Sequence, residues 1–300
     1  FLGAEGVPVA LAVPSPEALG RGSVPSYASP ESAALALSRA VAYAQWRARP
    51  QGVVPDLPGL DLEAARALVA AHPHDGEYLT DGAAAELLRA VGLRLWPTRR
   101  AESLEQALCA ADEMGWPVVL KSADERWRNR ADVGAVQLDL SGPDELGAAW
   151  VRLQGLVGGG VALVQPMAAP GVSTVVRMLA DPAVGPLVQL RLGGVAADLL
   201  ADPATRALPL TDLDAGRLVT SIRGASLLEG TDTAALQDVL LRVARLGEEV
   251  PAVAEVVLNP VLVGLAGVTL LHAGVRLLPP GADPERGPRR LRAETAGLLL

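Results

Sequence analysis

From Asp61 onward the sequence alternates between helical and strand-like segments, and this alternation restricts the fold more than any other feature. Helical spacing or capping residues mark segments 62–71, 80–92, 103–114, 143–156 and 232–247. Short apolar runs predict strands near 93–96, 117–121, 136–140, 161–165, 173–179, 186–192, 253–258 and 266–271. Half of the 300 residues are hydrophobic but only 3% are aromatic, so the core must consist mainly of Ala, Val and Leu. The sequence therefore predicts an α/β protein.

The first 60 residues follow a different pattern. An apolar run at 7–13 predicts a strand, and Ser29-Pro30 predicts the start of a helix that ends before Pro50. Segment 51–60, with two prolines and two glycines, predicts a linker. One strand and one helix cannot make a core, so residues 1–50 are interpreted as the tail of a domain whose body lies upstream. The absence of an initial Met agrees with an excerpt from a longer polypeptide. The main domain is then expected at 61–280, with a solvated tail at 281–300.

The charge and the apolar pattern argue against two classes of partner. The chain has 34 acidic and 26 basic residues and a net charge of −8, so we expect neither a general nucleic-acid surface nor an anionic-membrane surface. The most apolar stretch, 250–278, contains Glu255 and Arg276 and lacks the ~20 uninterrupted apolar residues of a spanning helix. The single cysteine, Cys109, excludes an internal disulfide framework and is expected to be a small core residue. These features predict a cytoplasmic protein.

Lys121 is the only lysine in a chain that has 25 arginines. It ends the predicted strand 117–121, which begins just after the turn-forming Gly115-Trp116. A compact ammonium group at a strand end suits nucleotide phosphates, where the wider fork of arginine would not serve equally well. The alternative is a solvated lysine at a strand terminus.

Two glycine-rich segments are weaker candidates for phosphate binding. Leu192-Gly193-Gly194 follows an apolar strand, and either lets the backbone approach a phosphate or forms a hairpin turn. Gly158-Gly159-Gly160 has no following Lys-Ser/Thr and is interpreted as a connector.

Oxygen and nitrogen ligands for a metal are sparse. Glu255 and Asn259 bracket an apolar strand and are candidate oxygen ligands for Mg²⁺, although Asn259-Pro260 also fits a strand-end turn. His72 and His74 have poor spacing for a metal pair, so structural roles are expected for both. The chain has no G-x-S-x-G elbow, so Ser/His/Asp catalysis finds no support.

Several motifs, taken in order, resemble the ATP-grasp half of NDP-forming acyl-CoA synthetases, including actinobacterial versions fused to GNAT-type protein acetyltransferases. They are GWPVVLK at 115–121, RNRADVGAV at 128–136, VQPM at 164–167, DP with VGP at 181–186, LGG at 192–194 and AEVVLNP at 254–260. Residues 1–50 are similar to the end of the preceding flavodoxin-like CoA-ligase domain. The resemblance implies an ATP-grasp domain of two α+β subdomains at 61–280, preceded by the last βα unit of that flavodoxin-like domain.

The resemblance also implies a site for ATP or ADP. Its implied nucleotide contacts are Lys121, Ser122, Val164, Gln165, Met167, Gly193 and Gly194. Asn259 is the implied oxygen ligand for Mg²⁺.

The sequence departs from the family pattern at positions that carry the chemistry. The family is expected to pass phosphate from ATP to a histidine and then to an acid that is transferred to CoA. Asn129 occupies the position of that histidine, and its amide nitrogen is not nucleophilic. Val257 replaces the Asp of E-x-D-x-N-P, His272 replaces a second acidic ligand, and Arg177 stands where glycine is usual. The resemblance therefore implies that phosphoryl transfer is abolished or crippled.

The leading hypothesis is a degenerate ATP-grasp module with a regulatory or scaffolding role in a larger acyl-CoA ligase or acetyltransferase polypeptide. It predicts weak, metal-independent nucleotide binding and no phosphoenzyme. The implied partners are a nucleotide, the upstream CoA-binding and CoA-ligase domains of the same polypeptide, and a GNAT acetyltransferase domain. One alternative is an active ATP-dependent acyl-CoA ligase with a different nucleophile, and another is an interaction module that binds no nucleotide.

Overall fold

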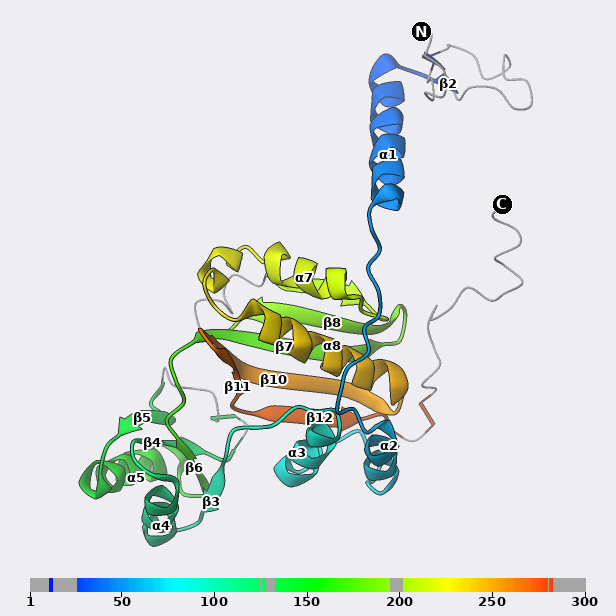
Figure 1. The fold of residues 1–300 in the computed structure, drawn as a ribbon. Helices are drawn as coiled ribbons and strands as arrows, with labels where there is room; N and C mark the ends of the chain where they lie inside the picture. The colour runs from blue at the N-terminus through cyan, green and yellow to red at the C-terminus, as the bar shows by residue number, and fades with distance from the viewer. Residues whose placement is uncertain are drawn as a thin grey trace. The chain divides into compact units, whose positions relative to one another are not determined.

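The computed structural model describes residues 11–12, 26–124, 126–127, 133–194, 202–279 and 281–282 (Figure 1). The chain divides into two compact units, Phe1–Gln51 and Gly52–Leu300, and each is described by itself. Within the described residues, no helix combines the length and the apolar character needed to cross a membrane.

The first unit contains a short parallel strand pair and one helix. Strand β1 (Leu11–Ala12) pairs with β2 (Ser26–Tyr27), and helix α1 spans Pro30–Ala48. The side chain of Ser29 accepts a hydrogen bond from the Ser32 N–H, and Pro30 occupies the first turn, as the sequence predicts. The predicted strand at 7–13 lies outside the described residues except for 11–12. The assignment of this unit to a flavodoxin-like domain stays a prediction.

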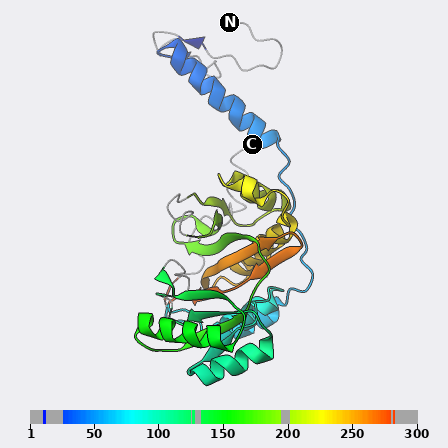
Figure 2. The ribbon, with the colours of Figure 1, turned by 90° about the vertical axis from the view of Figure 1, so that its left-hand side faces the viewer.

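The second unit contains a small sheet of four antiparallel strands. Its strand order is β3 (Arg99–Ala101), β6 (Ala162–Pro166), β4 (Val118–Ser122) and β5 (Val136–Leu140). Helices α4 (Leu104–Met114) and α5 (Pro143–Val157) pack on one face of the sheet and close a small apolar core. Figures 1 and 2 both place this layer at one end of the unit, away from α7 and α8.

The larger sheet of the second unit is also antiparallel. Its strand order is β11 (Gly267–Leu270), β10 (Val253–Gly264), β7 (Val172–Asp181), β8 (Gly185–Leu192) and β9 (Ala204–Ala207), and β12 (Ala273–Leu277) also pairs with β10. The helices of this part are α2 (Leu62–Ala70), α3 (Asp81–Ala90), α7 (Asp212–Ser221) and α8 (Thr233–Glu249), with a 3₁₀ turn η3 at Ala225–Leu228. Helix α8 packs against β7, β8 and β10 through the main apolar core.

The sequence predictions for the helices and most strands are confirmed, but one strand prediction is wrong. Segment 93–96 forms only an isolated bridge at Leu95, and the strand of this region lies later, at Arg99–Ala101. Trp96 explains the difference, because its main-chain N–H donates to the Leu270 carbonyl at 2.8 Å and its indole N–H to the Pro166 carbonyl at 2.9 Å. The segment therefore links the two sheets instead of joining either ladder.

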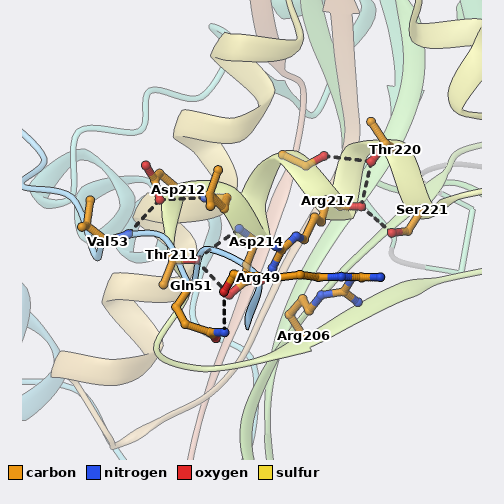
Figure 3. Close-up of polar contacts among 12 residues, drawn as sticks. Arg49, Gln51, Val53, Arg206, Thr211, Asp212, Asp214, Arg217, Thr220 and Ser221 are labelled. Atoms are coloured by element: carbon orange, nitrogen blue, oxygen red, sulfur yellow. Dashed lines mark hydrogen bonds and ion pairs between the residues drawn. The ribbon is translucent and has the colours of Figure 1, made fainter. Parts of the chain in front are cut away.

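Residues 52–60, predicted as a linker, form no helix or strand but are bonded to the body of the second unit. The Val53 N–H donates to the Asp212 carboxylate at 2.9 Å, and the Val53 carbonyl accepts from the Asp212 N–H at 3.0 Å (Figure 3). The same end of α7 is capped by Thr211, whose hydroxyl accepts from the Asp214 N–H at 3.2 Å (Figure 3). Further along, Arg242 of α8 donates to the Pro58 carbonyl at 3.1 Å.

Candidate functional site

A cleft of about 540 Å³ opens on the face of the small sheet that points away from α4 and α5. Successive side chains of a strand point to opposite faces, so each strand divides its residues between the core and the cleft. In β6, Ala162 and Val164 enter the core under the helices, while Leu163 and Gln165 line the cleft. The opposite wall is formed by α3 and by the segment at 271–273.

Lys121 of β4 is the buried cation of this cleft, which Arg89, Arg99 and Arg100 also line. It is only 5% exposed, and its Cα is paired with Leu163 in β6 and with Val136 in β5. The other walls bring Asp81 and His272 to the same cleft. Lys121 is therefore a buried cleft residue and not a solvated lysine at a strand terminus, and such a cation suits an anionic ligand.

Gln165 ties the small sheet to the opposite wall of the cleft. Its side chain is 3% exposed, and its amide nitrogen donates to Thr98 Oγ1 at 2.6 Å and to the Leu271 carbonyl at 3.0 Å. The position of the amide is thereby fixed, and the sheet is fastened to the segment that follows β11.

The other nucleotide contacts predicted on the small sheet take three different positions. The side chain of Val164 packs in the core, as described above. Ser122 is buried beside a second recess of about 280 Å³, and its hydroxyl accepts from the Asp124 N–H at 3.2 Å. Met167 follows β6, is 38% exposed, and donates its main-chain N–H to the Pro117 carbonyl at 2.9 Å.

Gly193 and Gly194 lie at the end of β8 in the large sheet, and neither is among the residues that line the cleft. The Gly193 N–H donates to the Ser173 carbonyl at 2.8 Å, and a Cβ at this position would lie 2.4 Å from Ser173 Oγ. Gly193 thus has a steric role in strand pairing. The hairpin-turn alternative for this glycine pair stays a prediction, because the connection from β8 to β9 includes residues outside the described ones.

Glu255 on β10 is the centre of a buried ion-pair cluster. Its Oε1 accepts from Arg177 Nε at 2.6 Å and forms an ion pair with Arg177 Nη2 at 2.5 Å, and its Oε2 accepts from Arg276 Nε at 3.2 Å and Nη2 at 3.1 Å. Oε2 also accepts from the Tyr78 hydroxyl at 2.9 Å. The Glu255 side chain is 5% exposed, whereas those of Arg177 and Arg276 are 44% and 36% exposed.

The cluster fixes the charge state of the carboxyl group. Burial alone would raise the pKa of Glu255, but the hydrogen bonds from Tyr78, Arg177 and Arg276 outweigh burial and lower this pKa below its ordinary value. The pKa of the Tyr78 hydroxyl is raised, first by burial and then by its bond to Glu255. Glu255 is therefore ionised, and the cluster carries a net charge of +1.

Of the two residues proposed from sequence as Mg²⁺ ligands, Glu255 does not fit a divalent cation, and Asn259 stays a prediction. Glu255 has both oxygens engaged by cationic donors, so a metal would have to displace two guanidinium groups. Asn259 is held through its backbone, with its N–H donating to the His272 carbonyl at 3.1 Å. Among the residues that the structure describes, no three His, Cys, Asp or Glu side chains gather to hold a metal.

Of the remaining candidates from the sequence, none that the structure describes is among the residues that line the cleft. Asn129, the predicted replacement for the relay histidine, lies outside the described residues. His72 and His74 have the expected structural roles, because their ring nitrogens bond the Leu68 carbonyl at 2.8 Å and the Val69 carbonyl at 3.2 Å, near the end of α2. The prediction for Cys109 was wrong, since it is exposed on α4 while the core face of that helix carries alanines.

Comparison with known proteins identifies the family. Residues 70–277 match the family described as the ATP-grasp domain. The chain belongs to the ATP-grasp family. It is 29% identical over 211 residues to the β subunit of ADP-forming acetate–CoA ligase II of Pyrococcus furiosus, covering 65% of this chain and 89% of that subunit. It is also 29% identical over 262 residues to ADP-forming acetate–CoA ligase I of Archaeoglobus fulgidus.

That second match covers 83% of this ATP-grasp chain but only 38% of the Archaeoglobus protein, so the activity of the whole ligase is not shown for this chain. A solved acetyl-coenzyme A synthetase 1 of Ca. Korarchaeum cryptofilum is 32% identical, with a TM-score of 0.56, and covers 67% of this chain and 92% of that one. It was obtained with coenzyme A and Mg-AMPPCP, and its phosphohistidine segment points towards the nucleotide-binding site.

The sequence singled out Lys121, Gln165 and Glu255, but it did not reveal that Arg177, Arg276 and Tyr78 would converge on Glu255. The available signal was an arginine in the interior of two otherwise apolar strands, at 177 and 276. Strand pairing brings them together, because Glu255 is in register with Arg276 on one side and is two positions from Val257, the partner of Arg177, on the other.

Proposed function

We propose that this chain is the nucleotide-binding ATP-grasp module of an NDP-forming acyl-CoA synthetase-like protein, and that it binds nucleotide without carrying a phosphoryl relay. The observation that supports this best is the cleft of about 540 Å³, which lies in the size range of small-molecule sites and has the buried Lys121 in its wall. The family and the ligand of the Korarchaeum structure point to an adenine nucleotide.

Different residues of this chain contribute to nucleotide binding in different ways. Lys121 supplies a positive charge for phosphate oxygens, and its burial excludes water that would screen the attraction. Gln165 fixes the relative position of the two cleft walls, and Met167 offers a half-exposed apolar surface near the end of β6. Of the other predicted contacts, we retain Ser122 at the adjoining recess, whereas Val164 packs in the core and Gly193 lies close against Ser173.

A phosphoryl relay needs a nucleophile and a metal, and the chain offers neither in the usual form. Asn129 cannot hold a phosphoryl group on its amide nitrogen, and Glu255 is engaged by two arginines. Mg²⁺ would supply charge neutralisation on the phosphates, but the described side chains do not offer it a ligand set. We therefore propose a regulatory or scaffolding role within a larger acyl-CoA ligase or acetyltransferase polypeptide.

The domain organisation is part of the same proposal. Residues 1–50 would be the end of a CoA-ligase domain, since α1 exposes Leu35, Tyr43 and Trp46, the kind of apolar surface that a larger domain covers. The implied partners are the upstream CoA-binding and CoA-ligase domains and a GNAT acetyltransferase domain. Co-purification of the full-length polypeptide with coenzyme A, and loss of that binding on deletion of the upstream domains, would test this part.

Calorimetry tests the binding function. Titration of the chain with ATP, ADP and GTP, each with and without Mg²⁺, should give saturable heat for at least the adenine nucleotides. The Lys121→Ala variant should lose it, whereas Arg152→Ala, which removes a positive charge on the outer helix α5, should not. Absence of heat with all three nucleotides would favour a pure interaction module.

A further inference from the structure

The arginine pair around Glu255 is more cationic and more rigid than an ordinary surface ion pair. One carboxylate holds two guanidinium groups, each through Nε and Nη2, and a tyrosine hydroxyl completes the carboxylate. Such two-point bonds fix the planes of the guanidinium groups. In the described part of the chain, the Nη1 groups of Arg177 and Arg276 have no protein acceptor.

The pair is placed on the sheet face opposite α8. Arg177 is flanked on β7 by Val176 and Met178, which enter the core, so its own side chain points to the other face. On β12, Val275 and Leu277 likewise enter the core and Arg276 points away from it. The two guanidinium groups, each about two-fifths exposed, are therefore open to a ligand on that face.

Two short chain segments connect the cluster to the Lys121 cleft. Tyr78 precedes the start of α3 by three residues, and Asp81 at that start lines the cleft. His272 lines the cleft as well and precedes Arg276 by four residues, which corresponds to about 13 Å along an extended chain. The same two chain segments therefore carry both the cleft wall and the arginine pair.

We propose that Arg177 and Arg276, held by Glu255, form a phosphate-binding clamp that takes the role of a divalent cation when this chain binds nucleotide. The inference rests on the proposed nucleotide binding and adds to it the residues and the charge that receive the phosphates. A divalent cation neutralises phosphate oxygens and fixes their geometry, and two immobilised guanidinium groups do both. The preferred ligand is then the metal-free polyphosphate anion.

The test compares metal-free and Mg²⁺-containing binding in matched variants of the whole chain. The affinities for ADP, ATP and inorganic tripolyphosphate are measured by calorimetry in EDTA and again in excess Mg²⁺. The variants are Arg177→Gln and Arg276→Gln, and the control is Arg206→Gln. Arg206 lies in β9 of the same sheet and is paired with the core residue Val188, so it lies on the opposite face.

The wild-type chain should bind in EDTA and gain no affinity from Mg²⁺. Each clamp variant should bind about tenfold or more weakly in EDTA, and the Arg206 control should match the wild type. If a glutamine variant does not fold, Arg177→Lys and Arg276→Lys keep the charge but lose the two-point bond, and should still weaken tripolyphosphate binding several-fold.

The results separate the clamp from the proposed function. Nucleotide binding that requires Mg²⁺, or that is the same in the clamp variants and the control, overturns the clamp and leaves the function standing. Binding of tripolyphosphate but of no nucleotide supports the clamp and overturns the function. Failure to bind any of the three ligands overturns both.

Discussion

The two sheets of the second unit each bury one charged side chain on the face away from their covering helices, but the surroundings of these two side chains differ. In the small sheet, Lys121 lines a cleft large enough for a small molecule. In the large sheet, Glu255 is engaged by Arg177, Arg276 and Tyr78. The chain thus keeps a cation that suits a phosphate, while its candidate metal-binding acid has become part of an internal salt bridge. The proposed function therefore separates nucleotide binding from metal-dependent chemistry.

The largest effect on stability is expected from removing the charge of Glu255. Glu255→Gln leaves two guanidinium groups without their shared carboxylate, and should lower the free energy of unfolding by about 2 kcal/mol, because both arginines can partly return to water. Glu249→Gln is the matched control, since Glu249 forms an exposed pair with Arg66 and should cost under about 1 kcal/mol. Urea unfolding measures both, and equal losses would contradict the special role of the cluster.

Lys121→Ala is expected to act on ligand binding. Removing the buried cation of the cleft, while the exposed Arg99 and Arg100 of β3 remain, should weaken ADP binding by about tenfold or more, equivalent to about 1.4 kcal/mol. Fluorescence titration with a labelled ADP measures the change. A Lys121→Ala chain that binds ADP as the wild type does would show that the cleft in the small sheet is not the nucleotide site.

The sequence analysis predicted the candidate residues of the small sheet better than the charged cluster of the large sheet. Lys121 ends a strand whose alternation fixes its face, and Gln165 lies on a neighbouring strand of the same kind, so local pattern was enough. Glu255, Arg177 and Arg276 come together only through the register of β10 with β7 and β12, which no local pattern determines. Strand β12 was also missed, because it continues an apolar stretch in which no turn residue separates it from β11.

The stability of the folded chain should depend on pH through Glu255. The folded-state pKa of Glu255 is lowered, so its contribution is fully present above the ordinary carboxyl pKa of about 4.5 and is lost as the pH falls through the folded value. Wild-type stability should decline more steeply than that of Glu255→Gln below about pH 4.5. Urea unfolding at a series of pH values from 6 downward checks this, and parallel curves would argue against an ionised Glu255 in the native state.

The smallest effect is expected from Tyr78→Phe. It removes one neutral donor from Glu255 and leaves both guanidinium groups in place, so it should cost about 0.5–1 kcal/mol of stability. Metal-free tripolyphosphate binding should be unaffected. A loss of binding as large as that of Arg177→Gln would show that the hydroxyl, and not the guanidinium pair, contacts the ligand.

Incubation with ATP labelled at the γ-phosphate tests whether the chain binds nucleotide without a phosphoryl relay. Filter binding on the same sample confirms that the nucleotide is held, and denaturing electrophoresis at alkaline pH preserves any phosphohistidine. We predict retained nucleotide and no covalent label, with or without Mg²⁺. Acid-labile label on the wild-type chain would contradict the account and establish an active relay through another nucleophile.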